Sequence, residues 1–113
     1  MQQPRILIVD SEEACSVQYA RLVARLQPLE LRIERVIQDA RDTLSRDPWD
    51  VVIVILRPEV DKAVLYELLE TVDPHVPIIV VDVQPSITTA RSCLHAGAGD
   101  YLDFAHIETD LED

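Results

Sequence analysis

Three short stretches of the chain consist almost entirely of aliphatic residues. They are Arg5–Val9, Val51–Leu56 and 76–81. Unbroken apolar runs of about four to eight residues are typical of strands that are buried on both faces of a parallel sheet. These runs therefore predict three central strands.

A fourth stretch, 30–36, alternates instead, with Leu31 and Ile33 apolar and the residues beside them polar. Successive side chains of a strand point to opposite faces, so this pattern predicts a strand with one face in water, at the edge of the sheet. A last short strand is predicted over 101–104.

Between these strands apolar residues recur about every three or four positions, the spacing of an amphipathic helix. Gly97 lies where a helix commonly ends on a glycine. Alternating strands and helices with short connections predict one doubly wound α/β domain with a parallel sheet and right-handed crossovers. The predicted helices cover 15–26, 37–44, 64–72 and 86–96.

The chain has 113 residues, of which 48% are hydrophobic and 27% charged, as in one ordinary globular domain. Its apolar runs are far shorter than the roughly 20 residues that cross a membrane. The first residues lack the pattern of a secretory signal. Cys15 and Cys93 have no metal-binding spacing and indicate reduced core thiols. We therefore expect a cytoplasmic domain without a membrane partner.

The formal net charge is −11 at pH 7. Most of it lies in residues 63–113, where Arg91 stands against ten acidic residues, a net of −9. Such an excess repels the phosphates of nucleic acids. We expect no nucleic acid binding by this domain.

Ligands of open parallel sheets bind beyond the carboxyl ends of the strands. In this chain those ends are acidic, with Asp10, Asp82 and Asp103 near them. Gly97 and Gly99 are the only glycines, so no dinucleotide-binding fingerprint or phosphate-binding loop can follow the first strand. No Ser or Cys lies in register with a His and a base either, and we predict no catalytic residue and no cofactor.

Three segments resemble the receiver domain of bacterial response regulators. Segment 6–12 is an apolar strand that runs into acidic residues, 77–82 is similar to the family's fourth strand, and Gly-Ala-Gly-Asp-Tyr-Leu at 97–102 is the most specific match. The resemblance covers most of the chain. It implies a flavodoxin-like (βα)5 sheet in strand order 2-1-3-4-5. The fifth helix would be truncated, so 1–113 would be one receiver-like domain at the start of a longer protein.

The residues that such a domain needs for phosphorylation are replaced. In the family a carboxylate at the end of the third strand accepts the phosphoryl group, and an acidic pair, a hydroxyl and a lysine bind metal and phosphate. Aligning the third strand on Asp50 places Ile55 at the acceptor position, whereas aligning it on Pro58 places Val54 there. Asp10 is kept, while the other positions differ: Ser11 replaces the second acid, Asp82 the hydroxyl and Phe104 the lysine.

Two roles stay open for the remaining acids. Asp10 and Glu13 fit a helix N-cap with a reciprocating acid, which we favour over a remnant metal ligand. Asp10, Glu12 and Asp82 are weak candidates for attracting a hard cation. Tyr101 matches an aromatic residue that changes rotamer in active receivers, but without the hydroxyl we expect a packed or partner-facing ring.

The resemblance implies a phosphorylation-independent pseudo-receiver, which acts by protein interaction or dimerisation on an attached or associated output domain. The alternative is a flavodoxin-like sensor that binds a small ligand or a cation. The face that receivers commonly use for dimerisation would include Arg91, His95, Asp100, Tyr101 and Asp103.

Overall fold

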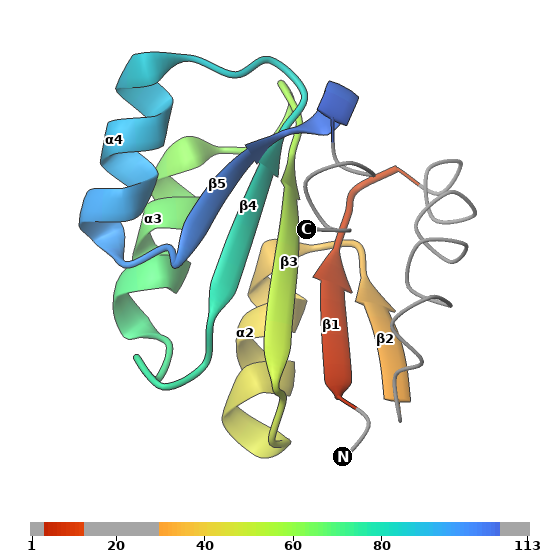
Figure 1. The fold of residues 1–113 in the computed structure, drawn as a ribbon. Helices are drawn as coiled ribbons and strands as arrows, with labels where there is room; N and C mark the ends of the chain where they lie inside the picture. Colours follow the sequence, from red (N-terminus) through yellow and green to blue (C-terminus); the bar gives the residue numbers. More distant parts are fainter. Residues whose placement is uncertain (1–3, 13–29, 107–113) are drawn as a thin grey trace.

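The three aliphatic runs form the centre of a five-stranded parallel sheet in a computed structural model that describes residues 4–12 and 30–106 (Figure 1). The strand order is β2-β1-β3-β4-β5, as the resemblance implied. The strands are β1 Arg5–Val9, β2 Glu30–Glu34, β3 Val51–Leu56, β4 Ile78–Asp82 and β5 Asp100–Asp103.

Three helices cover one face of the sheet (Figure 1). Alternate residues of the central strands, among them Leu7, Val54 and Val80, are fully buried beneath them, together with Leu65 and Cys93 of the helices. The helices are α2 Ile37–Arg46, α3 Lys62–Thr71 and α4 Ile87–Ala96, and a 3-10 turn, η1 Phe104–His106, follows β5.

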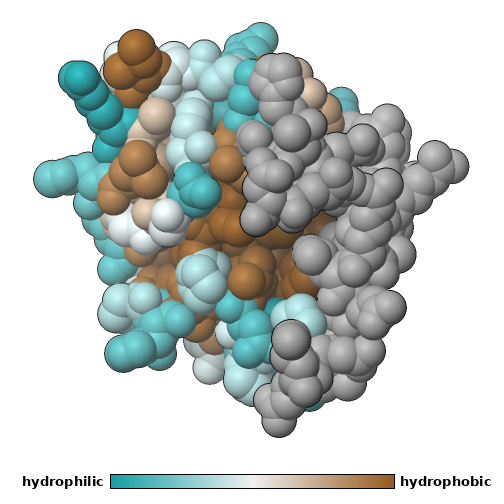
Figure 2. Space-filling view, viewed as in Figure 1, coloured by the Kyte–Doolittle hydropathy of each residue, from teal (hydrophilic) through white to brown (hydrophobic). Residues whose placement is uncertain are grey.

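The opposite face of the sheet has its own apolar cluster. Ile8, Ile53, Ile55 and Val81 are buried in it. The register explains why, because Ile8 pairs with Ile53 and Ile55 with Val81, so these side chains share one face of the pleat. Figure 2 shows apolar residues gathered at the centre of this face.

Element boundaries differ from the predicted ones by one or two residues. The strand predicted over 30–36 ends at Glu34, because Val36 already accepts the first main-chain bonds of α2. The strand predicted over 76–81 runs from Ile78 to Asp82. β5 begins at Asp100 and ends at Asp103, since Phe104 starts η1. The predicted helix over 15–26, Glu13, Cys15 and the segment after 106 lie outside the described residues.

Cys93 is a buried free thiol, as predicted. Burial, and then the nearby charge of Asp82, raise its pKa to about 11. In the described part of the chain, no helix is long and apolar enough to span a bilayer.

Gly97 ends α4 as predicted, with φ at +124°. Its N–H bonds to the carbonyl of Leu94, and the N–H of Ala98 bonds to that of Cys93, so the turn satisfies the last carbonyls of the helix. A Cβ at position 97 would lie 3.0 Å from the carbonyl oxygen of Leu69.

We expect Gly97→Ala to lower the free energy of unfolding by about 1–3 kcal/mol, because it adds both backbone strain and this contact. Urea denaturation followed by circular dichroism measures the loss. Gly99→Ala is the matched control, since a Cβ there meets the carbonyl oxygen of Ile78 at an ordinary 3.6 Å. Equal losses in the two variants would contradict this account of the turn.

Candidate functional site

A buried ion pair lies at the carboxyl edge of the sheet, where β1 and β3 end. Arg57 Nε donates to Asp10 Oδ1 at 2.8 Å, and Arg57 Nη2 donates to Asp10 Oδ2 at 3.3 Å. Arg57 Nη1 also lies 3.0 Å from Glu12 Oε2. The Asp10 side chain is 0% exposed and that of Arg57 9%. One guanidinium therefore contacts two of the acids that follow β1.

The aromatic ring of Phe104 closes the site from the side of β5. Arg57 Cζ lies 5.6 Å from the ring centroid, within the range of a cation–π contact. The guanidinium is thus held between carboxylates and an aromatic face. Phe104, which the resemblance aligns with a lysine, thus places its ring beside the positive charge of Arg57.

Asp10 also bonds to the main chain that follows it. Its Oδ1 accepts the N–H of Glu12 at 3.0 Å, as the side chain of an N-cap does. The predicted partner in the cap, Glu13, lies outside the described residues, so the reciprocal bond stays a prediction. Asp10 therefore combines a local turn with the ion pair to Arg57.

Ile55 and Val54, the two positions that the resemblance aligns with the phosphoacceptor, are both buried aliphatic residues. β1 and β3 pair Val9 with Val54, so Ile55 lies level with Asp10. Ile55 is 1% exposed and packs in the apolar cluster of its face, while Val54 is buried beneath the helices on the other face. An aliphatic side chain has no lone pair with which to attack phosphorus.

Asp82 bonds to Tyr101 on the helix-covered face of the sheet. Tyr101 donates its hydroxyl to Asp82 Oδ2 at 2.5 Å and accepts the N–H of Ser86 at 3.2 Å. Asp82 Oδ1 accepts the N–H of Gln84. Burial, and then the hydrogen bond to Asp82, raise the pKa of the Tyr101 hydroxyl. Tyr101 is therefore a packed aromatic that bonds inward.

The three weak cation candidates do not converge. Asp82 pairs with Leu56 and shares its face, whereas Asp10 and Glu12 surround Arg57 on the other side. Within the described residues, no group of three or more His, Cys, Asp or Glu side chains could hold a metal ion. A divalent cation at Asp10 would meet the guanidinium at hydrogen-bond distance, so the residues present do not fit magnesium.

Ser11 lies beside this site and donates its hydroxyl to Glu59 Oε1 at 2.9 Å. Both residues line a cavity of about 240 Å³ between the starts of α2 and α3, together with Val36 and Asp61. Ser11 therefore links the loops after β1 and β3, and its hydroxyl is not directed to the ion pair.

The predicted interaction face is formed by α4 and β5. Arg91, His95 and Asp100 are exposed on it, whereas Tyr101 and Asp103 are half-buried. Ile87 and Leu94 belong to the apolar spacing that predicts this helix, but in the structure they are 74% and 49% exposed. They are seven positions apart and so lie on one side of α4.

Arg57 was not predicted to belong to the site, because the carboxyl ends of the strands were interpreted as acidic. A signal was present in the sequence. Arg57 directly follows a central strand, and the neighbouring strand ends at Asp10. Adjacent parallel strands end at the same edge of a sheet, so an Arg and an Asp in these positions can meet.

Solved receiver domains share this fold. One from an HD domain-containing protein of Pseudomonas fluorescens has a TM-score of 0.81 and 24% identity, over 98% of this chain and 90% of that one. The receiver domain of a sensor histidine kinase of Pseudomonas aeruginosa, with a magnesium ion in its active site cleft, has a TM-score of 0.76 and 19% identity, over 98% and 96%. The fold is therefore that of a receiver domain.

The similarity extends to sequence for the response regulator protein PilR of Pseudomonas aeruginosa, which is 29% identical over 103 residues. The match covers 90% of this chain and 23% of PilR. No family model matches the chain. These findings support a receiver domain of the response-regulator type, and the chain spans less than a quarter of this relative's length.

We expect Arg57→Met to lower the free energy of unfolding by about 3–5 kcal/mol, because it leaves Asp10 charged and buried without its cation. Adding Asp10→Asn to this variant should restore part of the loss. Urea denaturation of the single and double variants measures both effects.

Arg41→Met is the matched control for this prediction. It breaks the ion pair with Glu67, in which both side chains are about half exposed, and should cost less than about 1 kcal/mol. A loss for Arg57→Met as small as that of the control would show that the buried pair adds little stability.

Tyr101→Phe should cost about 1–3 kcal/mol near neutral pH, since it removes one of the two hydrogen bonds to the buried Asp82 carboxylate. Because the pKa of Tyr101 is raised in the folded protein, its contribution to stability depends on pH. The contribution of Tyr101 is complete below the ordinary tyrosine pKa of about 10 and is lost as the pH rises above it. Urea denaturation at neutral and alkaline pH measures both effects.

Tyr66→Phe, which removes a hydroxyl from a partly buried ring of α3, is the control for Tyr101→Phe. It should keep the alkaline loss of stability, whereas Tyr101→Phe should reduce it. Identical pH profiles for Tyr101→Phe and the unmodified protein would argue against a role of this hydroxyl.

Proposed function

We propose that the chain is a signal-transduction receiver that works without phosphorylation and without catalytic activity of its own. In the cytoplasm it would act through protein contacts on an attached or associated output domain. The observation that supports this most directly is the Asp10–Arg57 ion pair, with buried Ile55 beside it.

The charge balance of the site supports the proposal. Phosphoryl transfer to a receiver needs a carboxylate nucleophile and a metal ion that neutralises the charge of the transferred group. Here the acids that would bind the metal already have a cation, Arg57, and the acceptor position is apolar. The two changes are independent of each other. Loss of the acceptor alone would leave a site that could still bind a metal ion, and loss of metal binding alone would leave a carboxylate acceptor.

The state of Tyr101 also supports independence from phosphate. Its hydroxyl bonds to Asp82 and to the N–H of Ser86, which caps α4. This bridge connects β4, β5 and the start of α4 with groups that belong to the chain itself. The position of α4 would therefore not depend on a hydroxyl that engages a phosphoryl group.

The surface for protein contact would be the α4–β5 face. Ile87 and Leu94 are exposed on α4, and a shallow cavity of about 310 Å³ lies beside Pro85, Ala90 and Tyr101. Exposed apolar residues rimmed by polar ones mark protein contact sites. Arg91, His95 and Asp100 supply that polar rim.

Incubation with acetyl phosphate or beryllofluoride and magnesium should change neither the mass, the circular dichroism spectrum nor the sedimentation of the protein. Ile55 cannot form the acyl phosphate, and Arg57 excludes the metal. Intact-mass spectrometry and sedimentation velocity make the measurement.

A receiver domain with an intact acceptor aspartate, treated in parallel, shows that the reagents are active. A stoichiometric phospho-adduct on any aspartate of this chain would disprove the proposal. So would a magnesium-dependent change of sedimentation in the presence of beryllofluoride.

A further inference from the structure

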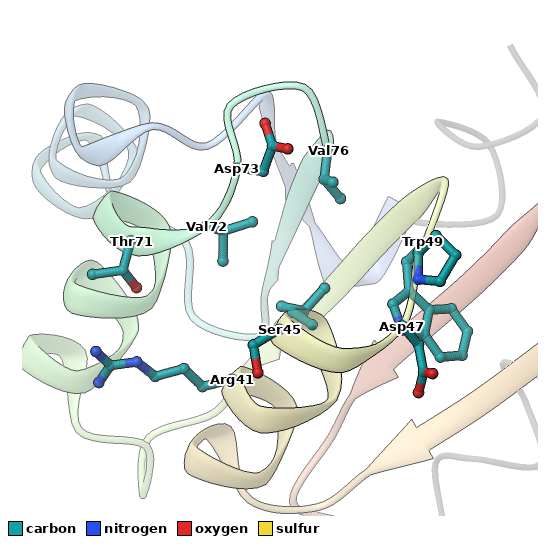
Figure 3. Close-up of a pocket in the computed structure, with 10 residues that line it drawn as sticks. Arg41, Ser45, Asp47, Trp49, Thr71, Val72, Asp73 and Val76 are labelled. Carbon is teal, nitrogen blue, oxygen red and sulfur yellow. The ribbon is translucent and has the colours of Figure 1, made fainter.

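A further cavity lies at the amino-terminal edge of the sheet, opposite the Asp10–Arg57 pair. Its volume is about 490 Å³, within the range of roughly 300–1,000 Å³ that is common for ligand sites. Figure 3 shows side chains from the ends of α2 and α3 and from the loops before β3 and β4 around it. The site formed by Asp10, Arg57 and Phe104 lies at the other edge of the sheet and shares no residue with this cavity.

Trp49 forms an apolar wall of the cavity and has an unusual polar atom. The residue is 6% exposed, and its indole Nε1 has no hydrogen-bond acceptor, alone among the buried side-chain nitrogen and oxygen atoms of the described residues. A buried donor without a partner costs about 1–3 kcal/mol. An acceptor that enters the cavity would recover this energy once the ring turns toward it.

The rim of the cavity is negative. Asp47 and Asp73 line it, and hydrogen bonds from His75, first that of its main-chain N–H, lower the pKa of Asp73 and keep this carboxylate charged. Arg41 also lines the rim, but its guanidinium is paired with Glu67 at 2.9 Å. The local charge therefore favours a cationic ligand.

Two helices add to this negative potential. α2 and α3 both end at the cavity, where Ser45, Thr71 and Val72 line its wall. The carboxyl end of a helix has a partial negative charge, which a basic residue in the last turn offsets. Arg46 lies in the last turn of α2, but α3 has no basic residue there.

We propose that this cavity binds a basic side chain of a partner polypeptide, with an adjacent main-chain carbonyl. Asp47 and Asp73, on different sides of the cavity (Figure 3), would attract the guanidinium or ammonium group by their charge, while Trp49 packs against its aliphatic stem and donates to the carbonyl. Arginine fits best, because its planar guanidinium stacks on aromatic rings and binds carboxylates. The net charge of −11 favours a basic partner over a second copy of this chain.

This inference does not depend on the proposed function. A phospho-adduct at the opposite edge of the sheet would disprove phosphorylation independence and leave the basic docking site intact. Conversely, loss of peptide binding would leave the Asp10–Arg57 site as described.

Trp49 is the only tryptophan of the chain, so its fluorescence reports on the cavity directly. The probes are three capped tripeptides, valine–arginine–leucine and its counterparts with glutamine or glutamate at the centre. The arginine peptide should change the Trp49 emission in a saturable way. The glutamine peptide should bind at least about tenfold more weakly. Added salt should weaken the binding of the arginine peptide.

Variants test the assigned groups by isothermal titration calorimetry. Asp47→Asn with Asp73→Asn should weaken arginine-peptide binding about tenfold, and Trp49→Phe should weaken it several-fold. Asp39→Asn with Glu70→Gln removes the same charge from exposed positions outside the cavity and should leave binding unchanged. Absence of saturable binding, equal binding of the arginine and glutamine peptides, or equal weakening by the two double variants would overturn the proposal.

Discussion

Burial of the central strands on both faces is the constraint from which the rest of this structure follows. β1, β3 and β4 have aliphatic side chains in both directions, so each face of the sheet needs an apolar cover. Parallel strands covered in this way must be joined by crossovers, and all their carboxyl ends meet at one edge. The residues that follow Val9 and Leu56 are thereby brought together in space, although 47 positions separate Asp10 from Arg57.

Once Asp10 is buried at that edge, its charge requires a partner. In this chain the guanidinium of Arg57 is that partner. The surrounding residues are compatible with this pairing. Ile55 is apolar and has no charge that a cation would have to compensate, and the ring of Phe104 lies beside the guanidinium. Ile55, Arg57 and Phe104 thus belong to one set of contacts at the carboxyl edge of the sheet.

The fold could be predicted from the sequence because two-sided burial and helical spacing are local patterns. Strand and helix positions agreed within one or two residues in the described part, whereas Ile55, Asp82 and Phe104 were singled out only through the resemblance to receiver domains. Side-chain pairing was harder to predict. Whether Arg57 reaches Asp10, whether Tyr101 turns toward Asp82, and whether Trp49 keeps an acceptor all depend on rotamers and contacts between distant segments, which no periodicity records.

A cation that is part of the polypeptide differs from a bound ion in one respect that matters in a cell. Occupancy of a metal site follows the free concentration of the ion and falls when chelating metabolites compete for it. Arg57 is covalently attached and remains protonated at every physiological pH. The positive charge beside Asp10 is thus put in place by folding itself, in a fixed one-to-one ratio with the carboxylate.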